Sequence, residues 1–143
     1  MPTDREILSR LESANTQEFI DLVSRPSLDE ERVLRAYFGE DRFRELQDLA
    51  LRRSTRAAAV RGNVIVLHGI MGSELTLHES PKNDDLIWVN VWRLIWGAFE
   101  KLACDDSGAS RLNVSASGIL KSYYGKQLLA LSNNWNVKAF WYD

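Results

Sequence analysis

The sequence predicts an α/β fold in which a small all-helical unit, residues 1–61, precedes a partial sheet of parallel strands, residues 62–143. Helical spacing with capping signals fills the first part, and a continuous β-branched run begins directly after it. A strand–helix–strand order follows. The composition shifts at the same boundary, because residues 1–62 hold 11 arginines with no lysine or tryptophan, whereas all five tryptophans lie beyond them.

The first unit is expected to contain three or four short helices. The pairs Thr3–Glu6 and Ser27–Glu30 have the spacing of a capping box, and apolar residues then recur at intervals of one helical face. Gly39 is expected to end one of these helices, because glycine adopts the left-handed backbone of a helix end without strain. Asp41 is expected to cap the helix that follows.

The second unit is expected to be a βαβ unit. Asn63–Leu67 is apolar without alternation, which is typical of a strand buried on both faces. Tyr124–Leu131 has the pattern of a helix, and Trp135–Tyr142 that of a second strand. This order implies parallel pairing with a right-handed crossover. At most one more strand, a short one near Leu75–Leu77, is expected beside this pair.

Composition excludes several classes of protein. The formal net charge of −2 gives no electrostatic reason to expect nucleic acid or an anionic membrane as a partner. The single cysteine, Cys104, excludes an internal disulfide framework and fits a reducing, cytoplasmic compartment. No stretch approaches the ~20 apolar residues of a membrane span, so no integral membrane segment is expected.

No cofactor or metal is expected either. Neither phosphate-binding motif, G-x-x-x-x-G-K-[ST] or G-x-G-x-x-G, occurs in the sequence. The two histidines, His68 and His78, lie ten residues apart without the cysteine or carboxylate pattern of a metal site. His78 is expected at the surface.

One motif carries chemistry, the glycine-rich turn His68–Gly72 directly after the first predicted strand. Gly69 and Gly72 permit close approach of a ligand, so the backbone N–H groups of Ile70 and Met71 are candidates to hold an oxyanion. The alternative is an ordinary turn from a strand into a loop. Ser73 beside it is interpreted as a loop or cap serine, because no neighbouring residue would activate it.

Three ordered blocks resemble the lecithin:cholesterol acyltransferase-like branch of the α/β-hydrolase superfamily. Val64–Leu75 is similar to the oxyanion segment of that family, and Leu86–Asn90 to its tryptophan-containing segment. Ser117–Leu129 and Val137–Asp143 are similar to the helix and strand that precede its Tyr-Asp-Trp-Arg signature. The resemblance covers about residues 62–143 and implies a partial α/β-hydrolase sheet.

That family cleaves or transfers acyl chains of lipid esters with a Ser-Asp-His triad, whose serine lies in a G-x-S-x-G elbow. By resemblance, the N–H of Met71 is an oxyanion donor, Ile70 shapes the same hole, Gly69 and Gly72 form the turn, and His68 is structural rather than a general base. The 143 residues contain no G-x-S-x-G, and they end within the Tyr-Asp of the signature. We therefore expect the N-terminal portion of a longer hydrolase or acyltransferase of lipid-like esters, inactive as this chain alone. The strand that bears the nucleophile would lie against the open edge of Val64–Leu67.

A tryptophan-rich stretch, Trp88–Leu102, has the spacing of an apolar helix. Packing in a core or between domains is favoured over a lipid-facing lid. Trp88 and Trp92 are nevertheless candidate substrate-binding residues.

A non-enzymatic alternative is an adaptor. Residues 1–61 would then be a module that binds a protein partner, with the partial hydrolase fold as a second surface. The simpler interpretation of the same residues is a helical cap that only covers the sheet.

Overall fold

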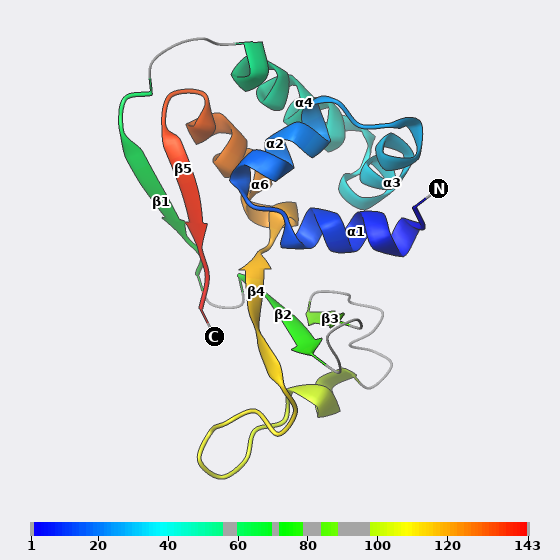
Figure 1. Cartoon of the computed structure of the whole chain (residues 1–143), viewed down its shortest axis with the longest axis vertical. Coiled ribbons are helices and arrows are strands. Elements are labelled where there is room, and N and C mark those ends of the chain that lie inside the picture. Colours follow the sequence, from blue (N-terminus) through cyan, green and yellow to red (C-terminus); the bar gives the residue numbers. More distant parts are fainter. Residues whose placement is uncertain (1, 56–59, 70–71, 79–83, 89–97, 143) are drawn as a thin grey trace.

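The computed structural model describes residues 2–55, 60–69, 72–78, 84–88 and 98–142 (Figure 1). Within those residues the fold is mixed α/β, with five α-helices, one 3-10 helix and five strands in two separate sheets. The predicted mixed α/β class is therefore confirmed.

Four helices occupy the first part of the chain, as predicted. They are α1 (Asp4–Ser13), α2 (Thr16–Ser24), α3 (Leu28–Phe38) and α4 (Glu40–Thr55). The capping boxes expected at Thr3–Glu6 and Ser27–Glu30 are both formed, and a third, unpredicted box at Asn15–Glu18 begins α2. Short-range signals thus set most helix starts.

The start of α4 differs from the prediction. Gly39 ends α3 with a φ of 83°, and its carbonyl oxygen accepts the backbone N–H of Phe43 at 2.9 Å. Because α4 already begins at Glu40, Asp41 lies inside its first turn, and the predicted cap at Asp41 is wrong. Both acidic residues instead complement the positive end of the helix dipole.

The predicted parallel pair is present. β1 (Asn63–Leu67) pairs with β5 (Asn136–Phe140) in a parallel register that runs from Asn63↔Asn136 to Leu67↔Phe140. The helix α6 (Lys121–Ser132) directly precedes β5, which confirms the predicted helix and extends it at both ends. Figure 1 shows the two strands side by side, apart from the second sheet.

Burial of β1 on both faces is not observed. Val64 and Val66 face inward and pack against the cluster formed by Ile119, Leu128 and Val137. The alternate residues Ile65 and Leu67 are 66% and 60% exposed. The prediction was wrong because no described element covers the outer face of the β1–β5 pair.

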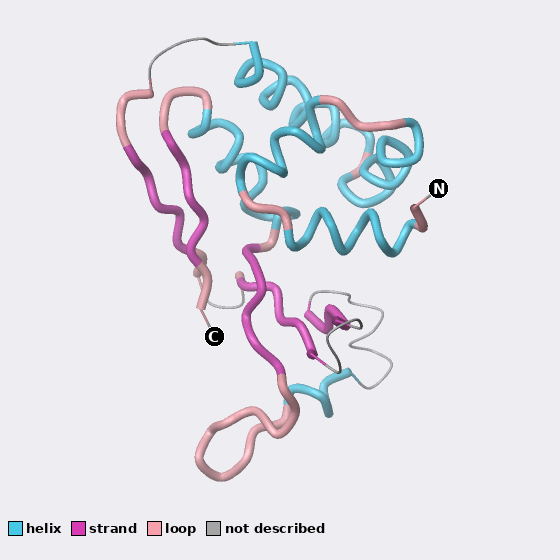
Figure 2. The backbone as a smooth tube through the Cα atoms, viewed as in Figure 1, coloured by secondary structure: helices cyan, strands magenta, loops and turns pink. Residues whose placement is uncertain are grey.

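The second sheet was largely unpredicted. β2 (Ser73–His78) is its central strand and lies antiparallel to β3 (Asp84–Trp88) and to β4 (Val114–Ile119). The strand expected near Leu75–Leu77 therefore exists but belongs to this sheet rather than to the β1–β5 pair. Figure 2 shows β4 leading directly into α6. Because β5 follows α6 along the chain, this helix connects the two sheets.

The predicted apolar helix over Trp88–Leu102 is not supported at either end. Trp88 is the last residue of β3, and Ala98–Leu102 form the short 3-10 helix η1. Its middle part, including Trp92, lies outside the described residues. None of the described helices has the length and apolar character that a membrane span requires.

Two apolar clusters stabilise the fold, and α6 contributes to both. Leu129 belongs to a cluster with residues of all four N-terminal helices, whereas Leu128 belongs to the cluster beneath β1 and β5. The members of the first cluster are Leu11, Ala14, Phe19, Ile20, Leu22, Val23, Leu34, Phe38, Phe43, Leu46, Ala50 and Leu129. The N-terminal helices therefore share their apolar cluster with α6, which belongs to the second part of the chain.

This shared core predicts a large cost for Leu129→Ala. Removing a fully buried leucine leaves a cavity, so we expect the free energy of unfolding to fall by about 2–5 kcal/mol in urea denaturation. Leu28→Ala is the matched control, because Leu28 is 87% exposed and its truncation should change stability by no more than about 0.5 kcal/mol. Equal effects of the two substitutions would contradict the shared core.

Candidate functional site

The glycine-rich turn follows β1 at the carboxyl end of the parallel pair. The backbone N–H of Gly72 donates to the carbonyl oxygen of Gly69 at 3.0 Å, so the two glycines of the motif lie close together. The N–H of Leu120, just before α6, donates to the carbonyl oxygen of Gly72 at 3.0 Å. The segment is thus anchored at the base of α6. Ile70 and Met71, the predicted oxyanion donors, lie outside the described residues.

His68 is a buried structural residue. Its Nδ1 lies 2.8 Å from the carbonyl oxygen of Gly69, and its Nε2 lies 3.2 Å from the backbone nitrogen of Tyr142. A carbonyl only accepts and a backbone N–H only donates, so both contacts together assign the neutral tautomer with the proton on Nδ1. Since both ring nitrogens are used, His68 has no lone pair available for a general base.

The ring of Tyr142 stacks on His68. The two ring centroids lie 4.2 Å apart at an interplanar angle of 19°, and the Tyr142 hydroxyl donates to the carbonyl oxygen of His68 at 3.1 Å. Three contacts therefore join His68, the first residue of the turn, to the segment that follows β5.

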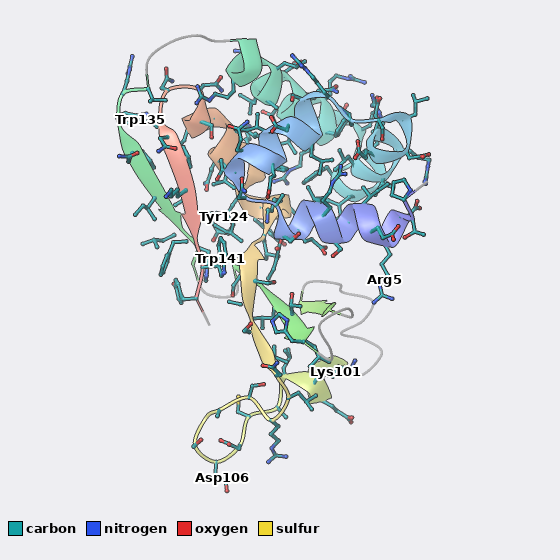
Figure 3. All side chains as sticks on the ribbon, viewed as in Figure 1. Arg5, Lys101, Asp106, Tyr124, Trp135 and Trp141 are labelled. Atoms are coloured by element: carbon teal, nitrogen blue, oxygen red, sulfur yellow. The ribbon has the colours of Figure 1, made fainter. Side chains whose placement is uncertain are left out.

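Tyr124 holds the turn from α6. The backbone N–H of Gly69 donates to the Tyr124 hydroxyl at 2.9 Å, so this N–H is already committed and is not a donor for a ligand. A Cβ on Gly72 would lie 2.6 Å from the His68 Cβ and 2.9 Å from the Tyr124 hydroxyl oxygen. Gly72 is therefore required by close packing. Figure 3 labels Tyr124 near the β1–β5 pair.

Two buried ionisable side chains beside the turn were not singled out from the sequence. Glu74 on β2 is 1% exposed and Lys121 at the start of α6 is 2% exposed, with 3.6 Å between Glu74 Oε2 and Lys121 Nζ. Burial raises the pKa of Glu74 to about 8, against the opposing effect of the Lys121 charge. Burial also lowers the pKa of Lys121. Only the fold brings these distant residues together.

The other predicted residues are not assembled into a catalytic site. Ser73 is buried as the first residue of β2, and within the described part of the chain no histidine or carboxylate hydrogen-bonds its hydroxyl. His78 is half-buried rather than at the surface, and its Nε2 lies 2.9 Å from the Ser115 hydroxyl oxygen. Trp88 is the last residue of β3 rather than the start of a helix. The described residues contain no cluster suited to a metal ion.

No family model, curated protein or solved structure matches this chain.

The packing of the turn predicts that replacing Gly72 by alanine lowers thermal stability more than replacing Gly69. Gly72→Ala should lower the midpoint of thermal unfolding by several degrees, because overpacking typically costs about 1–3 kcal/mol. Gly69→Ala is the matched control, since a Cβ there would meet only the Tyr124 hydroxyl oxygen, at 3.8 Å. Circular dichroism melts of the two variants test this. A larger loss for Gly69→Ala would contradict the described packing.

Proposed function

We propose that residues 62–143 form part of a serine hydrolase or acyltransferase of lipid-like esters, in which Gly69–Gly72 supplies part of the oxyanion hole. The nucleophile, acid and base would come from outside these 143 residues, which contain no G-x-S-x-G. The observation that carries the proposal is the place of the turn. The turn lies at the carboxyl end of a parallel strand, which is where open α/β sheets bind their ligands. His68 and Tyr124 hold it in position.

The chemistry requires donors aimed at a developing negative charge. Attack of a serine hydroxyl on an ester carbonyl converts the carbonyl oxygen into an oxyanion, which N–H groups at about 2.7–3.1 Å stabilise. The N–H of Gly69 is already committed to Tyr124. On the resemblance to the acyltransferase-like family, the proposed donor is the N–H of Met71, with Ile70 shaping the hole. A second donor would follow the nucleophilic serine, as in other α/β-hydrolases.

The free edge of β1 supports the same proposal. Among the described strands only β5 pairs with β1, so the other edge of β1 has no neighbour there. The outer face of the pair also carries the exposed apolar residues Ile65, Leu67 and Phe140. A strand that bears the nucleophile would pair along this edge and end next to the turn. Trp88 and Trp92 remain candidates for contact with the acyl chain.

The helices are better explained as a cap than as a separable adaptor. They share the cluster that contains Leu129, and Glu45 on α4 forms an ion pair with Lys126 on α6 at 2.5 Å. A module built to bind a separate partner would not need these contacts. No observation favours the adaptor function.

The proposal predicts a specific effect of removing one backbone N–H. In the longest product of the gene that encodes these residues, Met71→Pro should lower kcat for p-nitrophenyl ester hydrolysis by about 10²–10³-fold, because it deletes an oxyanion donor. Met71→Ala keeps the N–H and should stay within a few-fold of the unsubstituted protein. Melting curves of both variants control for folding. Equal losses in both would contradict the assigned donor.

The 143-residue chain provides a second test. It should hydrolyse the ester no faster than its Ser73→Ala variant and should not react with a fluorophosphonate probe, whereas the longest gene product should be labelled at a serine. Turnover by the 143 residues that Ser73→Ala abolishes would overturn the proposal. Failure of the longest gene product to hydrolyse esters or to label would also overturn it.

A further inference from the structure

A buried polar contact joins the helices to the second sheet. Lys121 Nζ, at the start of α6, donates to the backbone carbonyl oxygen of Glu12 near the end of α1. The same Nζ lies 3.6 Å from Oε2 of Glu74, on β2. α1, β2 and α6 therefore meet at one ammonium group.

Gly118 on β4 makes room for this contact. A Cβ at this position would clash with Glu74 Oε2 and would lie 3.0 Å from the carbonyl oxygen of Glu12 and 3.3 Å from Lys121 Nζ. Because the φ of Gly118 is not in the left-handed region, the glycine is needed for space rather than for its conformation. Glu74, Lys121 and the Glu12 carbonyl thus occupy space that a side chain at position 118 would fill.

We propose that Glu74, Lys121 and the Glu12 carbonyl form a proton-dependent latch, which holds α1 on the sheet while Glu74 is protonated and releases it as Glu74 ionises. This inference goes beyond the proposed enzymatic function and does not depend on it. Neither carboxylate oxygen of Glu74 has a hydrogen-bond partner among the described residues. Burying an ionised carboxylate without such partners is costly, and opening the contact would return it to water.

The surrounding charges favour the same direction. The charged groups that influence the pair are Glu12 on α1 and Glu18 on α2, both of them acids. Glu74 in turn acts on Tyr37 of α3. Arg42 on α4 acts on Tyr37, whose pKa burial raises to about 12. Ionised Glu74 therefore adds negative charge to an acidic environment in which Lys121 is the buried cation.

The direction of the pH dependence follows from Glu74. Burial raises its pKa from 4.5 to about 8, so the closed state binds a proton that the open state releases. The stabilisation is complete below about pH 4.5 and is lost as the pH rises through about 8. The lowered pKa of Lys121 has the opposite effect on the stability of the closed state. That stability increases as the pH rises above the value at which Lys121 loses its proton in the closed state. A Glu74→Gln variant isolates the first effect.

Native-state hydrogen exchange of the 143-residue chain tests the latch, with rates corrected for intrinsic pH dependence. We expect the protection factors of α1 amides to fall by about 50-fold between pH 6 and 8, with smaller changes in α4 and β5. In Glu74→Gln, which stays neutral, α1 protection should not change over this range. Glu45→Gln is the matched control, because Glu45 also pairs with α6 but is half-exposed, and it should behave like the unsubstituted chain.

Several outcomes would overturn the latch. They are pH-independent α1 protection in the unsubstituted chain, the same pH dependence in Glu74→Gln, or equal losses in α1, α4 and β5. A Glu74→Gln chain that fails to fold would also contradict it, because a neutral side chain of the same size is expected to keep the latch closed.

Discussion

Burial of α6 from two sides is the constraint on which the rest of the structure depends. Leu129 packs among the N-terminal helices, and Leu128 packs beneath β1 and β5. Gly125 makes the first contact possible, since a Cβ there would lie only 3.0 Å from Cζ of Phe19. The same helix carries Tyr124, which holds the turn at Gly69, and Lys121, which contacts Glu74. One helix therefore positions the cap, the sheet and the candidate site relative to one another.

Local signals account for the parts of the fold that the sequence predicts. The capping boxes at Thr3 and Ser27 depend on residues three positions away, and the α6 pattern on neighbours along one helix. By contrast, the four central residues of β4 (Val114–Ile119) are Ser115, Ala116, Ser117 and Gly118, which have low strand propensity, and the strand forms because it pairs with β2. Such a strand is specified by a partner some 40 residues away, which no local pattern reveals. The exposure of the outer face of β1 was not predicted for a related reason, because apolar composition does not show which face of a strand other elements cover.

The candidate site shows the same division between local and distant information. Gly69 and Gly72 are visible as a motif because a turn after a strand has a local signature. What holds the turn is not visible, since Tyr124 lies 55 residues from Gly69 and Tyr142 lies 74 residues from His68. The two contacts of the His68 ring agree with the structural role that the resemblance implies, but the residues that make them cannot be identified from the sequence. Glu74 and Lys121 became notable only once both proved to be buried.

The turn and the proposed latch both involve residues 72–74 and the start of α6. Only the latch also includes an atom of α1, the carbonyl oxygen of Glu12. Gly72 and Glu74 are joined to the residues around Leu120 by the hydrogen bond from Leu120 to Gly72 and by the pairing of Ser73 with Ile119. These backbone contacts lie within β2, β4 and the start of α6 and include no atom of α1. Release of α1 would remove the Glu12 carbonyl from Lys121 but would leave this ladder and the Tyr124 contact in place. The positions of Gly69 and Gly72 are therefore set by the sheet and α6, whereas the proposed latch would control only how firmly α1 is attached.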